Sequence, residues 1–281
     1  MDTSVTPDAV AELSAREVRR SVLSRWGFRI GVVVGWLSFI GAWYLVTEFV
    51  LGAQQLPPPH VVAQEAWEVL SDEGFGATVW ASLLRVLVGC TLALIVSVLF
   101  GMVIAYSNWW RNLLRALTRF FVSIPSVALA ILALIVFGVS GLGPTLTATL
   151  VATPYVMSSV AQGLTGVDRR LIVMSESFGR TRAQIITGVL LPSSVLSVIG
   201  GARQAFALAW RIVLLTEVFA ASDGVGFQIK RSFESYDVRG LLAWTVLFIG
   251  IMLLFENFVF RQLERRAFGG AHAVGGTGRQ Q

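Results

Sequence analysis

Charged side chains are scarce in this chain. Only 14% of its 281 residues are Asp, Glu, Lys or Arg, whereas a soluble domain carries about 25%. Hydrophobic residues make up 55% of the chain, and the mean hydropathy is +0.71. These values exclude an ordinary water-soluble domain. Because the apolar stretches are long enough for membrane-spanning helices, the sequence predicts an all-α integral membrane protein.

Cysteine and histidine are nearly missing as well. The single cysteine, Cys90, lies within an apolar run and has no partner for an intrachain disulfide or a CxxC motif. This excludes redox and zinc-cluster sites. The two histidines, His60 and His272, lie outside the apolar segments. A Ser–His pair within the membrane and an HExxH zinc site are therefore excluded too.

The sequence also lacks the motifs of nucleotide chemistry. It contains no GxxxxGK[ST] phosphate loop and no GxGxxG opening a strand–helix unit, and its Asp and Glu residues do not cluster as a di-metal site. We therefore expect a non-catalytic protein without cofactor or metal. The net charge of +5 does not indicate nucleic acid, because the basic residues fall in loops between apolar segments, where they set membrane topology.

Six apolar segments are present, and each predicts a transmembrane helix. The first contains 21 residues, more than the roughly 7–15 of a signal-peptide core, so we interpret it as an uncleaved span. A polar arm (1–29) precedes the membrane domain (30–266), and a flexible, Gly-rich tail (267–281) follows it. The predicted spans are approximately 30–50, 81–106, 120–137, 145–162, 195–221 and 241–260.

The distribution of charge predicts the orientation of these spans. Most of the 22 basic residues lie in the arm, the tail and the loops around 107–119 and 168–192. The loop 51–79 has acidic residues but no Lys or Arg. Under the positive-inside rule, both termini and the segment 168–192 are cytoplasmic.

The segment 168–192 is expected to form two short helices around a glycine turn. Asp168 is a candidate N-cap, and Gly179 fits the left-handed position after a helix end. Thr181 with Gln184 three residues later forms a capping box that opens the second helix. Pro192 is expected to stop this helix, since proline lacks an N–H and clashes with the preceding turn. Such a rigid element between two spans suggests a docking function.

The first of these helices carries an apolar face. Leu171, Met174 and Phe178 follow the helical spacing i, i+3, i+7. Arg180 and Arg182 supply a charged rim. This pattern fits a helix that docks onto a partner protein, and it also fits an amphipathic helix lying on the membrane surface.

Polar residues within the fifth predicted span are candidates for a translocation path. Gln204 and Arg211 are seven residues apart and share a helix face, while Glu217 lies on another face with Trp210. Intramembrane charges are costly and usually face the bundle interior or water. The alternative is a structural ion pair with neighbouring spans, or snorkelling of Glu217 towards the interface.

Other charges need no functional explanation. Glu48, Arg85 and Glu256 lie near span ends, where snorkelling or pairing between helices accounts for them. The nine tryptophans fall mostly at predicted membrane interfaces, as an aromatic belt would place them.

Several motifs in order resemble one family. Gly179 stands thirteen residues before Pro192, which follows Leu191. The other matching segments are 56–59 (LPPP), 163–168 (GLTGVD), 201–203 (GAR), 209–211 (AWR), Glu217 and 220–227 (AASDGVGF). From about Leu56 to Arg266 the chain thus resembles the permease subunits of bacterial ABC importers, most of all those for nitrate, sulfonate and taurine. The glycine–proline spacing corresponds to the cytoplasmic EAA loop of that family.

The chain departs from the family pattern within this loop. The Glu-Ala-Ala triplet falls on Val173, Met174 and Ser175, so its glutamate is lost, and Glu176 lies one residue beyond. Any contact that the glutamate makes is put in doubt. The helix–glycine–helix geometry is expected to persist, since Gly179 and Pro192 remain.

The resemblance implies the partners and the location of the protein. It implies a bacterial inner-membrane protein whose two permease copies, expected to be identical, form the path for a solute. A dimer of separate ABC ATPase subunits docks below, and an extracytoplasmic binding protein delivers the solute. The residues that would dock the ATPase are Leu171, Met174, Ser175, Glu176, Phe178, Gly179, Arg180, Arg182 and Pro192.

The solute and the class of transporter leave alternatives. A sulfonate-, taurine- or nitrate-like anion is implied by the subgroup alone, and related permeases carry other small organic molecules. An ATP-independent secondary transporter is a second hypothesis, but it would need a coupling-ion site and usually more spans. A membrane scaffold without transport activity is the third.

Overall fold

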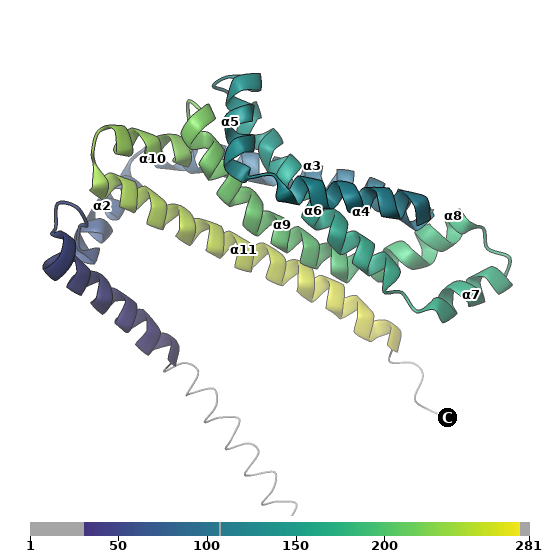
Figure 1. Cartoon of the computed structure of the whole chain (residues 1–281). Coiled ribbons are helices and arrows are strands. Elements are labelled where there is room, and N and C mark those ends of the chain that lie inside the picture. Colours follow the sequence, from purple (N-terminus) through teal and green to yellow (C-terminus); the bar gives the residue numbers. More distant parts are fainter. Residues whose placement is uncertain (1–30, 107, 276–281) are drawn as a thin grey trace, which may run out of the picture. The chain divides into compact units, whose positions relative to one another are not determined.

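Helices form all the regular secondary structure in the part of the chain that the structure describes. The structure is a computed structural model, and it describes residues 31–106 and 108–275. Figure 1 shows the helices η1 (Thr47–Leu51), α2 (Pro59–Ser71), α3 (Phe75–Tyr106), α4 (Asn108–Ser123), α5 (Ser126–Phe137), α6 (Leu142–Thr165), α7 (Arg169–Ser177), α8 (Arg182–Ile185), η2 (Ile186–Leu190), α9 (Leu191–Ala220), α10 (Val225–Glu234) and α11 (Val238–Gly275).

The chain divides into two compact units, and the first is Met1–Gln64. Its described part begins with a helix over residues 31–46 that passes into the π-helix η1. The indole Nε1 of Trp43 donates a hydrogen bond to the carbonyl of Pro57 at 3.1 Å. The hydroxyl of Tyr44 lies 2.9 Å from Nδ1 of His60, and the two rings stack. These contacts fold the segment after η1 back onto the helix.

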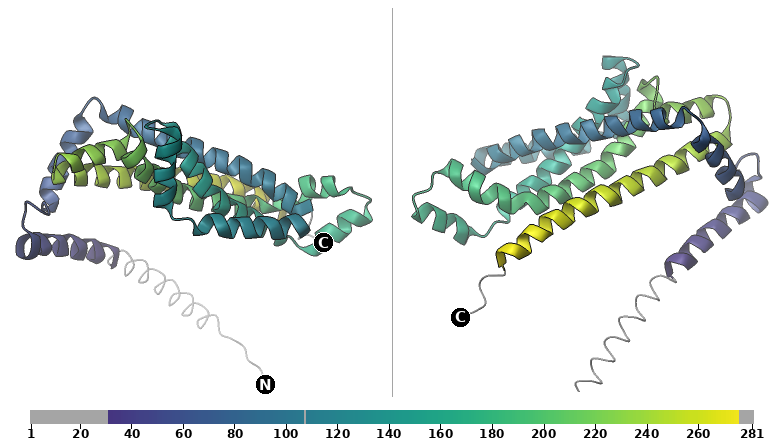
Figure 2. Two further views of the ribbon diagram at one scale, coloured as in Figure 1. Left: turned by 45° about the horizontal axis from the view of Figure 1, so that its top comes forward. Right: turned by 180° about the vertical axis from the view of Figure 1, so that it is seen from behind.

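The second unit, Glu65–Gln281, is built around α3, α6 and α9. These helices pack against one another, and α11 lies along α9 (Figures 1 and 2). Glycines set the separation between α6 and α9. A Cβ on Gly163 would lie 2.8 Å from Cβ of Ser197, and one on Gly201 would lie 2.5 Å from Cβ of Ser159. Such close packing of small residues holds helices together in lipid, where apolar surface gives no preference for protein over acyl chains.

Four helical segments are long and apolar enough to cross a membrane, and a bent pair could form a fifth span. The four are Gly31–Leu51, Phe75–Gly101, Arg182–Ala220 and Val238–Leu263. Helix α6 carries several threonines and serines and is enclosed by α3, α5 and α9. Over residues 31–106 and 108–275 the protein is therefore all-helical, with several candidate membrane spans.

The bent pair corrects the expectation of one continuous helix over 120–137. Residues Asn112–Ser123 of α4 and the whole of α5 meet at 87°. Pro125 stands at the N-cap of α5. Proline fixes its own φ and disfavours helical geometry for the residue before it, so the helix breaks here.

The last helix is also longer than expected. Helix α11 continues to Gly275, whereas the sequence predicted a flexible tail from residue 267. This stretch contains no proline to stop the helix, so a helix that is already nucleated continues through it despite Gly269 and Gly270. The predicted arm, 1–29, and residues 276–281 lie outside the described residues.

Candidate functional site

The segment between α6 and α9 has the caps that its sequence predicts. The carboxylate of Asp168 accepts a hydrogen bond from the backbone N–H of Arg170 at 2.9 Å, which confirms Asp168 as the N-cap of α7. Gly179 has φ +71° and donates its N–H to the carbonyl of Glu176 at 2.9 Å. A Cβ at Gly179 would meet no atom within 4 Å. The glycine is therefore required by backbone conformation and not by packing.

The second helix starts with the predicted capping box. The backbone N–H of Thr181 donates to Oε1 of Gln184 at 2.9 Å, and the N–H of Gln184 donates to Oγ1 of Thr181 at 3.4 Å. Two N–H groups at the start of α8 are thus satisfied by side chains within one helical turn.

The prediction that Pro192 ends this helix is wrong. Helix α8 passes through the π-helix η2 into α9 without a break. The N–H of Leu191 bonds to the carbonyl of Ile186, five residues back. The wider π-turn gives room for the ring of Pro192, which lies in the first turn of α9, and no α-helical bond is lost there. The segment is therefore joined rigidly to α9.

An apolar face of α7 is left uncovered by the residues that the structure describes. Leu171 and Met174 are 42% and 52% exposed, and Phe178 at the helix end is 79% exposed. Ser175, by contrast, is buried, and its hydroxyl donates to the carbonyl of Leu171 at 2.8 Å. Glu176, Arg180 and Arg182 are exposed around this face. In unit 2, α7 and α8 lie at the end opposite α10 (Figures 1 and 2).

The three translocation candidates have different environments. Gln204 and Arg211 are exposed on the same side of α9, and the guanidinium of Arg211 lies 5.2 Å from the centre of the Trp210 ring. Glu217 is fully buried. The three side chains do not form one site.

The buried carboxylate of Glu217 is held by three donors. Its Oε1 accepts from Nη1 of Arg85 at 2.6 Å, and its Oε2 accepts from the hydroxyl of Ser82 at 2.8 Å and from the N–H of Gly226 at 2.9 Å. The arrangement is a structural ion pair between α3 and α9, one of the three interpretations that the sequence left open. Three donors offset the cost of removing the charge from water.

Arg85 also reaches the turn between α9 and α10. Its guanidinium donates to the backbone carbonyl of Asp223 at 3.0 Å and forms an ion pair with the Asp223 side chain. A second interhelical pair, Nε of Arg203 with Oε1 of Glu256 at 3.1 Å, links α9 to α11. Arg85 and Glu256 are thus paired between helices and do not snorkel. One signal in the sequence pointed to Arg85 and Glu217, because opposite charges within two apolar segments need partners.

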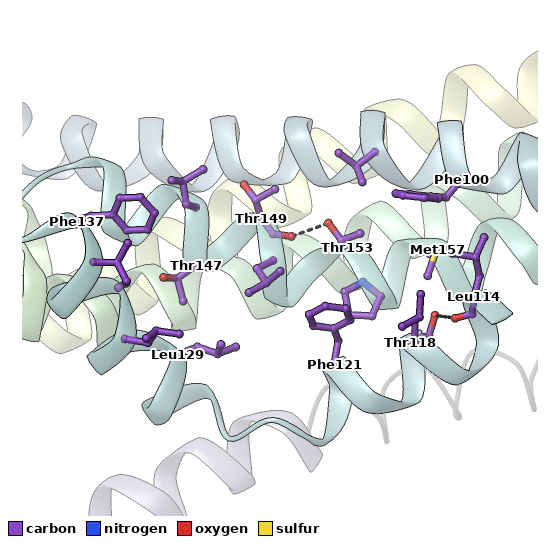
Figure 3. Close-up of a pocket in the computed structure, with 18 residues that line it drawn as sticks. Phe100, Leu114, Thr118, Phe121, Leu129, Phe137, Thr147, Thr149, Thr153 and Met157 are labelled. Atoms are coloured by element: carbon purple, nitrogen blue, oxygen red, sulfur yellow. Dashed lines mark hydrogen bonds between the residues drawn. The ribbon is translucent and has the colours of Figure 1, made fainter.

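A cavity of about 690 Å³ opens between α3, α4, α5 and α6. No motif in the sequence indicated this cavity. Figure 3 shows side chains of all four helices turned toward it. The lining residues are Val96, Phe100, Leu114, Leu117, Thr118, Phe121, Leu129, Leu132, Ala133, Val136, Phe137, Leu146, Thr147, Thr149, Leu150, Thr153, Pro154 and Met157.

The lining of this cavity carries no charged side chain. Its polar atoms are threonine hydroxyls, each of which donates to the carbonyl four residues earlier; for Thr118, Thr147 and Thr153 the distances are 2.8, 2.8 and 2.7 Å. These hydroxyls are satisfied within their own helices and offer only lone pairs to an occupant. The wall therefore lacks the nucleophile–base pair or metal ligands that catalysis would need.

A match to a protein-family model identifies the class of membrane protein to which this fold belongs. The model described as "Binding-protein-dependent transport system inner membrane component" matches residues 97–268. The chain belongs to this family. The matched region includes α7, α8, α9 and the break between α4 and α5, so the uncovered face of α7 is part of an ABC transporter permease.

Individual relatives agree with the family. The permease is 31% identical over 241 residues to a probable ABC transporter permease protein of Brucella melitensis biotype 1, covering 84% of this chain and 96% of the relative. It is 29% identical to the taurine transport system permease protein TauC of Escherichia coli K12, over 80% of this chain and 83% of that protein. It is 23% identical to the nitrate import permease protein NrtB of Leptolyngbya laminosa, over 88% of this chain and 94% of that protein.

A solved structure has the same fold as this permease. A chain of the inward-facing MetNI methionine ABC transporter aligns with a TM-score of 0.56 at 20% identity, covering 75% of the permease and 98% of that chain.

Proposed function

We propose that the permease forms the membrane path of an ATP-driven importer and docks its ATPase through α7 and α8. The observation that carries this proposal is the apolar face of Leu171, Met174 and Phe178. No part of the described structure covers this face, although capped helix ends and a left-handed glycine hold it in one conformation. A rigid, exposed apolar patch on a polar segment is typical of a protein interface.

The continuous helix from α8 through η2 into α9 supports a mechanical role. In the proposed mechanism, ATP binding closes two ATPase subunits, and the docked α7–α8 segment moves with them. Because no flexible linker separates α8 from α9, such a movement is transmitted to the helix that carries Gln204 and Arg211. Glu176, Arg180 and Arg182 would form the polar rim of the contact.

The membrane topology in this proposal has six spans with both termini in the cytoplasm. The four long apolar helices supply four spans, and the bent pair α4–α5 supplies the fifth. Helix α6 would be the sixth. Its threonines and serines are acceptable in a span because α3, α5 and α9 enclose it.

The proposed cargo is a small anion of the sulfonate, taurine or nitrate kind, delivered by an extracytoplasmic binding protein to a pair of permease copies. The names of the taurine and nitrate relatives support this class. On α9 the exposed Arg211 is available to a passing anion, whereas Arg203 pairs with Glu256. The proposed location is the bacterial inner membrane.

The test is recovery of an ATPase from the native host. The tagged permease is extracted in mild detergent, and its partners are identified by mass spectrometry. We expect a P-loop ATPase at about one copy per permease, and we expect its loss in Gly179→Asp. A matched control is Gly138→Asp, because Gly138 also has positive φ (+65°) and no atom within 4 Å of a Cβ, but lies at the end of α5.

Three results would count against the proposal. Recovery of the permease without any ATPase would favour an ATP-independent transporter. Normal ATPase recovery and normal transport in Gly179→Asp would show that this segment does not dock. An equal loss of ATPase recovery in Gly179→Asp and Gly138→Asp would point to a general folding defect.

A further inference from the structure

The ion pairs of Arg85 gather several segments at the end of unit 2 that carries α10. Arg85 and Ser82 lie on α3, Glu217 lies in the last turn of α9, and Asp223 lies in the turn before α10. The hydroxyl of Ser82 also accepts the N–H of Val225, the first residue of α10, at 2.8 Å. Three helices thus meet at one guanidinium and one hydroxyl.

The turn between α5 and α6 belongs to the same cluster. A Cβ on Gly141, the N-cap of α6, would lie 3.3 Å from Nη2 of Arg85, so this turn packs against the guanidinium. The N–H of Ser140 donates to the carbonyl of Ala220, the last residue of α9, at 2.9 Å. The α5–α6 turn therefore touches both α3 and the end of α9.

Glycines allow this close approach. A Cβ on Gly224, which has φ +98°, would lie 2.7 Å from both Nη1 of Arg85 and Oε1 of Glu217. A Cβ on Gly226 would lie 2.5 Å from Cβ of Glu217 and 2.5 Å from the carbonyl oxygen of Leu214. The backbone of the α9–α10 turn is thus built directly against the charged groups.

The two acidic partners of Arg85 differ in access to solvent. The side chain of Glu217 is 0% exposed, that of Arg85 is 10% exposed, and that of Asp223 is 60% exposed. Glu217 has two further donors, and its separation from Arg85 would leave a buried charge without its counter-ion. Asp223 can leave the guanidinium and be solvated at once, so its contact is the weaker of the two.

We propose that Arg85, Glu217 and Asp223 form a latch at this end of the permease, in which the ion pair between the Asp223 side chain and Arg85 is the contact that breaks. While Asp223 holds Arg85, the α9–α10 turn and the α5–α6 turn stay closed against α3. Release of the Asp223 side chain leaves fewer bonds to break: the α9–α10 turn then separates from Arg85 and Ser82 once the backbone carbonyl of Asp223 and the N–H of Val225 also leave them, while the Arg85–Glu217 pair stays intact. Resting on the proposed function, the latch would close the end of the path opposite the ATPase until solute is delivered.

The single cysteine of the chain offers a way to measure this opening without an ATPase. Cys90 lies on α3, five residues beyond Arg85, and is buried in the cluster that includes Ala148, Ala209 and Val213 of α6 and α9. Opening of the two turns at this end would let a small reagent enter between the helices and reach the thiol. The rate at which N-ethylmaleimide modifies Cys90 then follows the population of the open form.

The experiment compares Asp223→Asn with the wild-type permease in lipid nanodiscs, with mass spectrometry to measure labelling of Cys90. We expect labelling to be about tenfold faster in Asp223→Asn, with a thermal unfolding midpoint close to wild type. Asp223→Glu keeps the carboxylate and should stay near the wild-type rate. Glu234→Gln is the matched control, since it removes an exposed carboxylate of an ion pair on the neighbouring α10 (3.9 Å to Lys230).

Two outcomes would overturn the latch. An unchanged labelling rate in Asp223→Asn would mean that Asp223 does not hold this end closed. Faster labelling together with a large fall in the unfolding midpoint would mean that Asp223 only stabilises the fold. Because the labelling needs no ATPase, failure of the latch and failure of the proposed importer function give different results.

Discussion

The guanidinium of Arg85 on α3 bonds to the buried carboxylate of Glu217 on α9, 132 residues further along the chain, with Nη1 and Oε1 2.6 Å apart. Neither residue could lie in an apolar environment alone. The pair fixes the distance between two of the three central helices, and the hydroxyl of Ser82 and the N–H of Gly226 complete the coordination of Glu217. This relationship leads to the first prediction.

Removing one member of this pair should damage the fold severely. Glu217→Gln leaves the charge of Arg85 buried without Glu217 as its counter-ion, and we expect a loss of about 3–5 kcal/mol in the free energy of unfolding. The double variant Arg85→Met/Glu217→Leu removes both charges and should recover part of this loss. Unfolding in detergent, followed by circular dichroism, measures the difference. A double variant less stable than Glu217→Gln would contradict the argument from burial.

Gly226 should tolerate no side chain. Gly226→Ala brings a methyl group against the carbonyl of Leu214 and the Cβ of Glu217, and because the carbonyl is backbone, the cost should be at least about 1–3 kcal/mol. Gly250→Ala on α11 is the control, since a Cβ there meets nothing within 4 Å. Alanine favours the helix at that site by up to about 1 kcal/mol. Thermal unfolding midpoints of both variants check this, and equal midpoints would refute the predicted contact.

The apolar face of α7 should matter for partner binding and not for stability. Phe178→Ser removes an exposed side chain, so the free energy of unfolding should change by less than about 0.5 kcal/mol. Burial of a phenylalanine at an interface contributes about 1.5–3 kcal/mol, which corresponds to roughly 10- to 100-fold in ATPase affinity. Titration of the permease with the recovered ATPase measures this affinity.

Val173→Ser is the matched control for this prediction. Val173 is 50% exposed on the same helix, but it lies about 200° around the axis from Leu171. The affinity of the Val173→Ser variant for the ATPase should stay near that of the wild type. An equal loss in both variants would mean that the ATPase does not recognise the Leu171–Met174–Phe178 face.

The π-helix η2 should depend on Pro192. Pro192→Ala supplies an N–H that can bond to the carbonyl of Gly188, which favours ordinary α-helix in place of the π-turn. Losing the extra residue of the π-turn would rotate α8 by about 100° relative to α9. We therefore expect near-normal stability but loss of ATP hydrolysis coupled to transport. Pro59→Ala, at the first position of α2, is the control. Fully coupled transport in Pro192→Ala would show that the π-turn does not set the angle of the docking segment.

Features that arise within one helical turn followed from the amino-acid order. The caps at Asp168, Gly179 and Thr181 were predictable because each depends on the side chain and backbone of neighbouring residues. The membrane class followed from composition, and the motif order around Gly179 and Pro192 pointed to the family that the model of residues 97–268 then established.

Tertiary structure alone decided the rest. The partner of Glu217 could not be read from the sequence, because Arg85 lies 132 residues away and only helix packing selects it among the available charges. The effect of Pro192 could not be read from the sequence either. A proline can end a helix or can be accommodated by a π-turn, and the packing of the neighbouring residues decides which of the two occurs. Ile185, Ile186 and Leu190 are buried against α6 and α9, and this packing keeps the helix continuous through the proline. Local hydrogen bonds are set by neighbours in sequence, whereas buried charges and helix continuity are set by neighbours in space.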